Sequence, residues 1–127
     1  MSELLNKDLS TRLKNVGFEM EVRGYYASNF GPYESWLGIN WNRREKYTSC
    51  PTQDECAEWL REKKGIFLQM EWRPLRQGWR CDIKFFEAKP EYIPFISVKS
   101  YPEAQLYGIT AAIEYLEQQK TLNDGKT

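Results

Sequence analysis

Residues 50–65 have the sequence CPTQDECAEWLREKKG, which contains nearly every signal that begins, orients and ends an α-helix. Thr52 and Glu55 have the spacing of a capping box, in which each side chain accepts a hydrogen bond from the other residue's backbone N–H. Acidic residues follow in the first turn, two lysines lie in the last turn, and Gly65 can adopt the left-handed conformation that ends a helix. The stretch therefore predicts a helix over residues 53–64.

One face of this predicted helix is apolar and the other is charged. Cys56, Trp59 and Leu60 fall on one stripe at helical spacing, whereas Glu58 and Glu62 fall on the opposite side. We expect the stripe to pack into a core and the carboxylates to face solvent. The helix therefore serves the fold, and its cysteine behaves as a small buried apolar side chain.

The chain before this helix has first a helical pattern and then an alternating one. Apolar residues at helical spacing predict a first helix over residues 3–15. Alternating apolar and charged residues predict a strand over 18–22 with one face in solvent. A long hairpin is expected over residues 24–48, with a second short strand from Leu37 to Trp41.

After the helix, two alternating segments at 66–72 and 79–85 predict antiparallel strands. Proline and glycine in the connection 73–78 indicate a turn. Trp72 and Trp79 fall on the apolar phase of the alternation, so we expect both indoles in the core.

The last helix is predicted from its cap and its small residues. Ser100 and Glu103 repeat the capping-box spacing, and the apolar pattern continues to residue 119. Gly108 and neighbouring alanines form a small-residue flank, which favours close packing on a sheet. We expect residues 120–127 to be a disordered tail.

The predicted element order is α-β-β-α-β-β-α, which indicates an α+β fold. We expect a single domain over residues 1–119, with a predominantly antiparallel sheet packed with helices. The order of the strands in that sheet is left open by the sequence.

Composition limits the partners and the location of the protein. The chain has 127 residues with 18 basic and 18 acidic side chains, so its formal net charge is zero, which disfavours nucleic acid as a partner. A membrane span needs about 18 consecutive apolar residues, and no segment of the chain is that long and apolar. The first residues also lack the apolar stretch of a secretory signal. We therefore expect a soluble, cytoplasmic protein that does not bind membranes.

Few catalytic groups are available. The absence of histidine excludes Ser-His and Cys-His dyads and metal sites that depend on imidazole, and no glycine-rich nucleotide motif occurs. Glu19 and Glu21 form a carboxylate pair on a predicted solvent face, where a raised pKa is not expected. Three cysteines are predicted to be reduced, and Cys50, just before a helix, is the best thiol candidate. We predict a non-enzymatic protein without cofactor or metal.

Four short motifs carry a resemblance to a known group of proteins. They are an initial L…LK..GF segment from Leu9 to Phe18, the PT……WLREK pattern from Pro51 to Lys63, a hairpin with Trp79, and SY.EA from Ser100 to Ala104. The chain resembles small uncharacterised proteins from gut-bacterial genomes and phages over about residues 4–118, and differs at Pro102, where the pattern has an acidic or polar residue. The resemblance implies a shared fold and a phage or prophage accessory protein, without an implied activity.

The turn of the second hairpin is one candidate binding site. Arg73, Arg76 and Arg80 lie within eight residues beside two tryptophans, and guanidinium groups beside aromatic rings suit phosphates, stacked bases or an acidic protein surface. The alternative is that the three arginines are ordinary solvated charges on an exposed turn.

A second candidate is the aromatic segment GYYASNFGPYESW. Its Phe30, Tyr33 and Trp36, with Tyr25 and Tyr26, are residue types that anchor protein interfaces. The alternative is that these rings cover the edge of the sheet.

Together these observations predict a protein-binding module of phage or prophage type that acts on a host protein. One alternative is a module that binds a small ligand or nucleotide between its arginines and aromatic rings, and another is a nucleic-acid-binding protein. The last helix has no basic residue from 101 to 119, so it could pair with the arginine turn of a second copy, and a homodimer is also possible.

Overall fold

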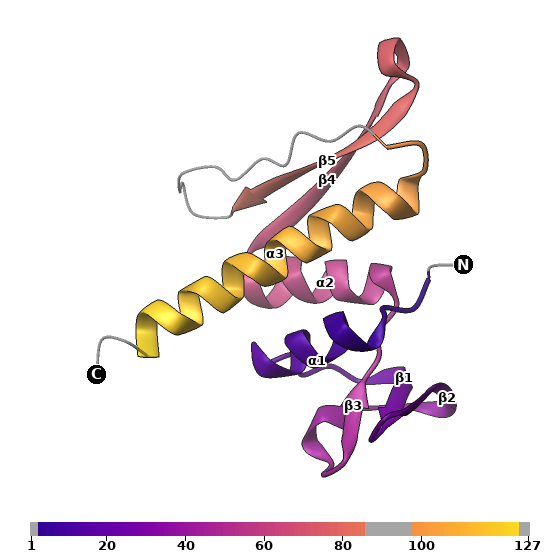
Figure 1. The fold of residues 1–127 in the computed structure, drawn as a ribbon, viewed down its shortest axis with the longest axis vertical. Coiled ribbons are helices and arrows are strands. Elements are labelled where there is room, and N and C mark those ends of the chain that lie inside the picture. The colour runs from indigo at the N-terminus through magenta and orange to yellow at the C-terminus, as the bar shows by residue number, and fades with distance from the viewer. Residues whose placement is uncertain (1–2, 86–97, 125–127) are drawn as a thin grey trace.

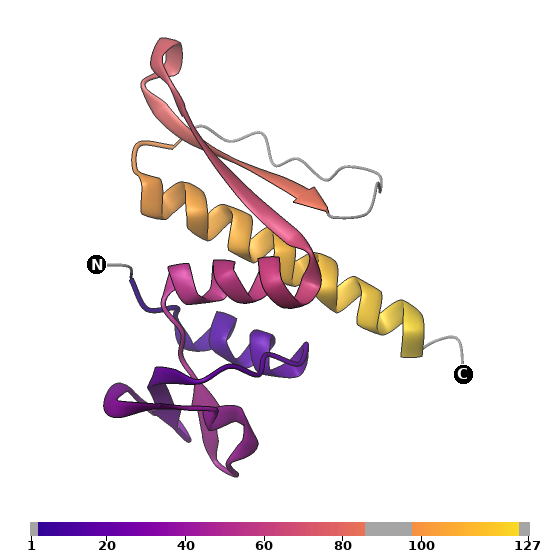
Figure 2. The ribbon, with the colours of Figure 1, turned by 180° about the vertical axis from the view of Figure 1, so that it is seen from behind.

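Three helices lie between two antiparallel sheets in the computed structural model, which describes residues 3–85 and 98–124 (Figure 1). A three-stranded sheet lies at one end of the stack and a two-stranded hairpin at the other, and the view from behind shows the same arrangement (Figure 2). The elements are, in chain order, α1 (Lys7–Asn15), β1 (Val22–Ala27), β2 (Phe30–Ile39), the 3-10 helix η1 (Trp41–Arg43), β3 (Tyr47–Ser49), α2 (Gln53–Lys64), β4 (Ile66–Arg73), the 3-10 helix η2 (Pro74–Arg76), β5 (Gly78–Phe85) and α3 (Tyr101–Asp124).

The predicted α+β class is confirmed, but the chain forms two sheets instead of one. The first sheet has the order β2-β1-β3, and the second is the β4–β5 hairpin. The strand β3 was not predicted, because three residues are too short for an alternating pattern to be recognised.

The central helix α2 forms as its sequence predicts. The Thr52 hydroxyl accepts a hydrogen bond from the Glu55 backbone N–H at 3.1 Å, and the Glu55 carboxylate accepts one from the Thr52 N–H at 2.8 Å. Gly65 ends the helix with a φ of 64°. Cys56, Trp59 and Leu60 are buried, so the predicted apolar stripe faces the core.

The prediction of a strand over residues 18–22 is wrong, since β1 begins only at Val22. Phe18 instead follows the end of α1, where its N–H donates to the Leu13 carbonyl at 3.0 Å. Its ring lies 5.0 Å from that of Trp59, between centroids. The alternation in this segment reflects an extended chain with one side packed on α2, and not pairing in a sheet.

The second strand also differs from its prediction. It runs from Phe30 to Ile39 and ends before Trp41, which begins η1. The Trp41 indole N–H donates to the Val22 carbonyl at 2.9 Å, and the ring stacks on Tyr25 at 4.0 Å between centroids. Trp41 is therefore a core residue that closes one face of the sheet.

The β4–β5 hairpin has an uninterrupted register from Ile66 opposite Phe85 to Arg73 opposite Gly78. Ile83 and Cys81 are buried on the face that packs on α3, as predicted. The prediction that Trp72 lies in the core is wrong, because the residue is 45% exposed. The tip of the hairpin extends past the start of α3, so no helix covers its last residues (Figure 1).

The last helix is longer than predicted. It continues to Asp124, beyond residue 119, so the expected tail is helical over most of its length, and residues 125–127 lie outside the described part of the chain. The Ser100 hydroxyl accepts from the Glu103 N–H at 3.2 Å, as its spacing predicted. Arg12 of α1 binds Glu117 of α3 through two hydrogen bonds of 2.7 and 3.0 Å, which ties the two helices together.

We expect the replacement of Gly108 by alanine to reveal how closely α3 lies on the hairpin. A methyl group at this position would overlap the Cys81 sulfur. The change Gly108→Ala should therefore lower the free energy of unfolding by about 1–3 kcal/mol, although a glycine-to-alanine change in an open helix stabilises it by about 1 kcal/mol. Urea denaturation followed by circular dichroism measures this difference.

Two further variants serve as controls for this prediction. In a Cys81→Ala background, Gly108→Ala should cost little or nothing, because the overlapping atom is gone. Gly38→Ala, which meets only ordinary contacts with Glu21, should change stability by less than about 0.5 kcal/mol. A stabilising effect of Gly108→Ala in the otherwise unchanged protein would contradict the close packing.

Candidate functional site

The aromatic residues singled out in the sequence separate into a buried set and an exposed set. Phe30, Tyr33 and Trp36 lie on β2, which is an edge strand of the first sheet, and Leu37 follows them. Their exposed fractions are 69%, 46%, 95% and 70% in chain order. We call these four side chains the β2 surface. The sequence predicted that Leu37 lies in a strand but did not predict that its side chain is exposed. An alternating pattern does not show which strand of a sheet is left uncovered.

Tyr33 is the member of the β2 surface that also contributes to packing. Its ring lies 5.6 Å from that of Tyr25, between centroids, and Tyr25 in turn stacks on Trp41. Tyr26 is buried, and its hydroxyl donates to the Leu5 carbonyl at 3.4 Å. The alternative interpretation, in which the aromatic rings pack on the sheet, thus holds for Tyr25 and Tyr26. The Trp36 side chain packs on almost nothing.

The backbone of β2 is poorly suited to pairing with another strand. Its register with β1 is irregular in two places, and Pro32 has no N–H to donate. The Arg23 guanidinium donates to the Ser35 carbonyl at 2.9 Å, so this backbone acceptor is already used. Such features protect edge strands from adding a further strand, and the β2 surface therefore offers side chains more than backbone.

The three arginines of the hairpin turn do not form one group of unpaired cations. Arg80 is mostly buried and forms an ion pair with Asp82, and Arg73 lies 3.5 Å from the Glu71 carboxylate. The side chain of Arg76 lies outside the described part of the structure. Trp79 packs edge-on against Trp72 at 5.5 Å and against Tyr101 at 5.2 Å, between ring centroids. These tryptophans support each other and the start of α3.

Cys50, the better thiol candidate in the sequence, is also buried. Its side chain is fully buried, and its thiol donates to the Leu5 carbonyl at 3.1 Å. Burial raises the pKa of Cys50, raises that of Cys56 to about 12, and raises that of Cys81 to about 11. A thiol whose pKa is raised by desolvation contains little thiolate at neutral pH, so it reacts slowly.

The carboxylates considered for acid–base chemistry are exposed or ion-paired. Glu19 lies 2.9 Å from the Arg43 guanidinium, and this hydrogen bond lowers the pKa of the Glu19 carboxyl. Glu21, the other member of that carboxylate pair, is exposed, as are Glu58 and Glu62 on α2. Among residues 3–85 and 98–124, no group of three or more potential ligands from cysteine, aspartate and glutamate could hold a metal ion.

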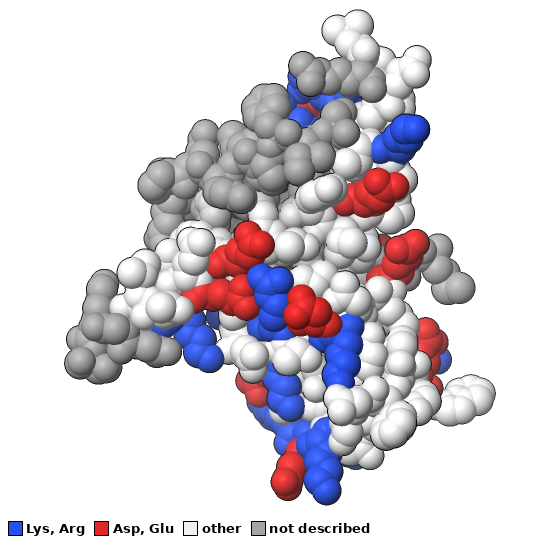
Figure 3. All heavy atoms as spheres, viewed as in Figure 1, with Lys and Arg blue, Asp and Glu red and all other residues white. Residues whose placement is uncertain are grey.

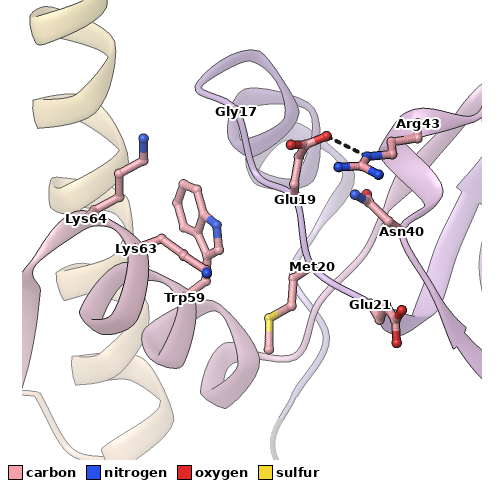
Figure 4. A pocket seen from close by; sticks show the side chains of 9 residues that line it. All are labelled: Gly17, Glu19, Met20, Glu21, Asn40, Arg43, Trp59, Lys63 and Lys64. Atoms are coloured by element: carbon pink, nitrogen blue, oxygen red, sulfur yellow. Dashed lines mark hydrogen bonds and ion pairs between the residues drawn. The ribbon is translucent and has the colours of Figure 1, made fainter.

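A cavity of about 520 Å³ lies beside the last turn of α2, and no motif in the sequence indicates it. Figure 4 shows that side chains from three separate segments line it, and Trp59 lies between the lysines of α2 and the Glu19–Arg43 pair. A second cavity of about 510 Å³ shares Gly17 and Lys64 with the first and extends to α3. No single motif could have revealed either cavity, since the lining residues are distant in sequence.

Charges of both signs are mixed on the surface. Figure 3 shows acidic and basic side chains interspersed around the middle of the molecule, without a large basic area on this face. The formal net charge is zero. These features give no support to binding through a phosphate backbone, which requires a basic face.

Comparison with protein-family models, with curated proteins and with solved structures finds no match to this chain. Within the part of the chain that the structure describes, no helix combines the length and the apolar character needed to cross a membrane.

The native thiols should be almost unreactive. With 5,5′-dithiobis(2-nitrobenzoate) at pH 8, the folded protein should release far less thionitrobenzoate in the first minutes than the three equivalents released in guanidinium chloride, because all three cysteines are buried. Absorbance at 412 nm measures the reaction. As a matched control, Glu58→Cys places a thiol on the exposed side of α2 and should add one rapidly reacting equivalent. Rapid labelling of Cys50 in the folded protein would contradict the burial.

Proposed function

We propose that this protein acts by binding another protein, and that the β2 surface is its principal contact. The observation that carries the proposal is the exposure of Phe30, Trp36 and Leu37 on one edge strand. Large apolar side chains that stay exposed can mark interaction sites, and tryptophan is enriched among the residues that contribute most to binding energy.

The arrangement favours a contact made by side chains. Pro32 and the Arg23–Ser35 hydrogen bond hinder the addition of a partner strand, whereas Trp36 can enter an apolar pocket. Tyr33 is held by Tyr25, so part of the surface is already ordered before binding. A preordered ring loses less conformational entropy when a partner binds.

A host protein is the proposed partner, and the protein is proposed to be a phage or prophage accessory protein without catalytic activity. Support for the origin comes from the resemblance to small proteins of gut-bacterial genomes and phages. Support for a binding role comes from the β2 surface, together with cysteines that are buried and a Glu19 carboxylate held in an ion pair. The proposed site of action is the cytoplasm.

The arginine turn ranks below the β2 surface as a contact. Arg80 is engaged by Asp82, and Arg73 is close to Glu71, so a ligand would have to compete with these carboxylates. A homodimer between the arginine turn and α3 has similar competition, because Glu117 of α3 is bound by Arg12 of the same chain.

The double variant Trp36→Ala, Leu37→Ala should lose binding and keep its stability. Both side chains are almost free of packing, so the melting temperature should fall by less than about 2 °C. Affinity for a protein captured stoichiometrically from a gut-bacterial lysate should fall by about 30-fold or more, the effect of removing one residue that dominates an interface. Calorimetry with the identified partner gives the dissociation constants.

The control is Leu75→Ala, Leu122→Ala, which removes two exposed leucines from the hairpin turn and α3. This variant should bind as tightly as the unchanged protein. Equal capture by all three proteins, or no stoichiometric partner for any of them, would contradict the proposal. Light scattering tests whether the partner is a second copy of this chain. In that case the unchanged protein and the control variant would be dimers, and the Trp36→Ala, Leu37→Ala variant would be a monomer.

A further inference from the structure

The outer edge of β4 is open to another strand. Within its sheet, β4 pairs only with β5. Among residues 3–85 and 98–124, the backbone of residues 67–73 makes no hydrogen bond outside this pairing. The outer edge of β5 differs, since Trp79 exchanges backbone hydrogen bonds of 2.6 and 2.9 Å with Val98. In the described chain, the unpaired edge of the hairpin is therefore that of β4.

The strand β4 lacks the features that hinder strand addition at β2. Its register with β5 is regular along its whole length, and it contains no proline, glycine or lysine. In β2, by contrast, two irregularities and Pro32 interrupt the edge. A regular and unprotected edge is a template for a further strand, because it presents a row of backbone donors and acceptors. The edge of β4 is therefore the one at which this fold can extend a sheet.

The side chains of β4 define what kind of strand fits beside it. Leu68 lies on the side of α3, since a methyl group at Gly108 would lie 3.3 Å from it. On this side Leu68 is half-buried and Trp72 is 45% exposed. Gln69 and Glu71 are exposed on the other side. A strand that extends this sheet must alternate in the same way, with its apolar residues on the side of α3. The β4 strand of a second copy has this pattern.

We propose that β4 pairs in antiparallel fashion with β4 of a second copy of this chain, with Met70 of the two copies opposite each other at a two-fold axis. In this register every residue from Phe67 to Arg73 has an opposite residue in the second copy. Gln69 lies opposite the partner's Glu71, and Phe67 lies opposite the partner's Arg73, so no like charges meet. An arginine beside an aromatic ring and an amide beside a carboxylate are favourable neighbours.

Alternation, charge and the position of α2 disfavour the other registers. A slip of one residue would place the apolar side chains of the two copies on opposite faces of the sheet. A shift of two residues toward the hairpin tip would put Glu71 opposite the partner's Glu71. The same shift in the other direction would bring Arg73 opposite the partner's Gly65, where the chain leaves α2. Larger shifts shorten the pairing, so the register centred on Met70 fits best.

This pairing joins the two hairpins into one antiparallel sheet of four strands. The two-fold axis between antiparallel strands is perpendicular to the sheet, so both α3 helices cover the same face. Trp72 then lies opposite the partner's Leu68, which covers part of an indole that the single chain leaves in solvent. The β2 surface lies at the other end of the molecule and stays free in both copies (Figure 1). The dimer therefore presents two β2 surfaces, which raises the effective affinity for a partner with two sites.

Disulfide formation between two variants tests the pairing and its register. In a mixture of Gln69→Cys and Glu71→Cys, the new thiols lie on opposite residues, with Cα atoms about 4.5–5.5 Å apart. In either variant alone they lie on diagonal positions, about 7–8 Å apart, where a disulfide does not form without backbone movement. We expect at least five times more linked dimer from the mixture than from either variant alone, measured by non-reducing gel electrophoresis. The native cysteines do not compete, because all three are buried.

Two substitutions at Phe67 test whether the partner's Arg73 lies opposite. Phe67→Lys and Phe67→Glu remove the same ring from a side chain that is 37% exposed, and circular dichroism checks that both variants fold. An added ammonium group repels the opposite guanidinium and an added carboxylate attracts it, and the two-fold axis repeats the contact. The dissociation constant of the Phe67→Lys dimer should therefore be at least tenfold higher than that of the Phe67→Glu dimer, measured by sedimentation equilibrium.

The unchanged protein should approach twice its chain mass of 15.1 kDa in light scattering as its concentration rises. The Trp36→Ala, Leu37→Ala variant should dimerise equally, so this inference and the proposed function fail separately. A monomer at every concentration, equal cross-linking in the mixture and the single variants, or equal dissociation constants for the two Phe67 variants would overturn the proposal. Loss of the dimer in the Trp36→Ala, Leu37→Ala variant would also overturn it, since self-association would then belong to β2.

Discussion

The burial of one stripe of α2 holds the molecule together. Cys56, Trp59 and Leu60 are almost completely removed from solvent, and α2 packs against both α3 and β4. Burial of three such side chains contributes several kcal/mol, on the order of 1.5–3 kcal/mol for each large apolar side chain, before the entropy of ordering the chain is subtracted. The last helix α3 extends this core, since it contacts α1, α2, β4 and β5.

The residues on either side of α2 connect it to both sheets. Cys50, two residues before the cap, donates its backbone N–H to the Gly24 carbonyl at 2.9 Å, and a side chain at Gly24 would overlap the Cys50 carbonyl oxygen. The Leu5 N–H donates to the Pro51 carbonyl at 3.0 Å. At the other end, Gly65 leads directly into β4. The position of α2 therefore determines where the first sheet and the hairpin lie.

This construction explains which surfaces are left for other molecules. Trp41 and Tyr25 are used in packing, so their rings are not available to a partner. The edge strand β2 receives no cover from the helices, and its apolar side chains stay in solvent. The cavity at the end of α2 lies beside Trp59 and is also lined by Met20 and Glu21 from the connection between α1 and β1. The proposed protein contact and the cavity are thus separate consequences of one core.

The sequence by itself determined the elements whose signals are local. The capping box and Gly65 define α2, and the alternation of β4 and β5 defines the hairpin, because hydrogen bonds between neighbouring residues and the two faces of one strand suffice to specify them. Only the tertiary structure decided that Phe18 packs on Trp59 without forming a strand, that Trp72 is exposed, and that Cys50 is buried. The cavity and the exposure of β2 likewise depend on which elements lie side by side, and contacts between residues far apart in the chain leave no periodic pattern in the sequence.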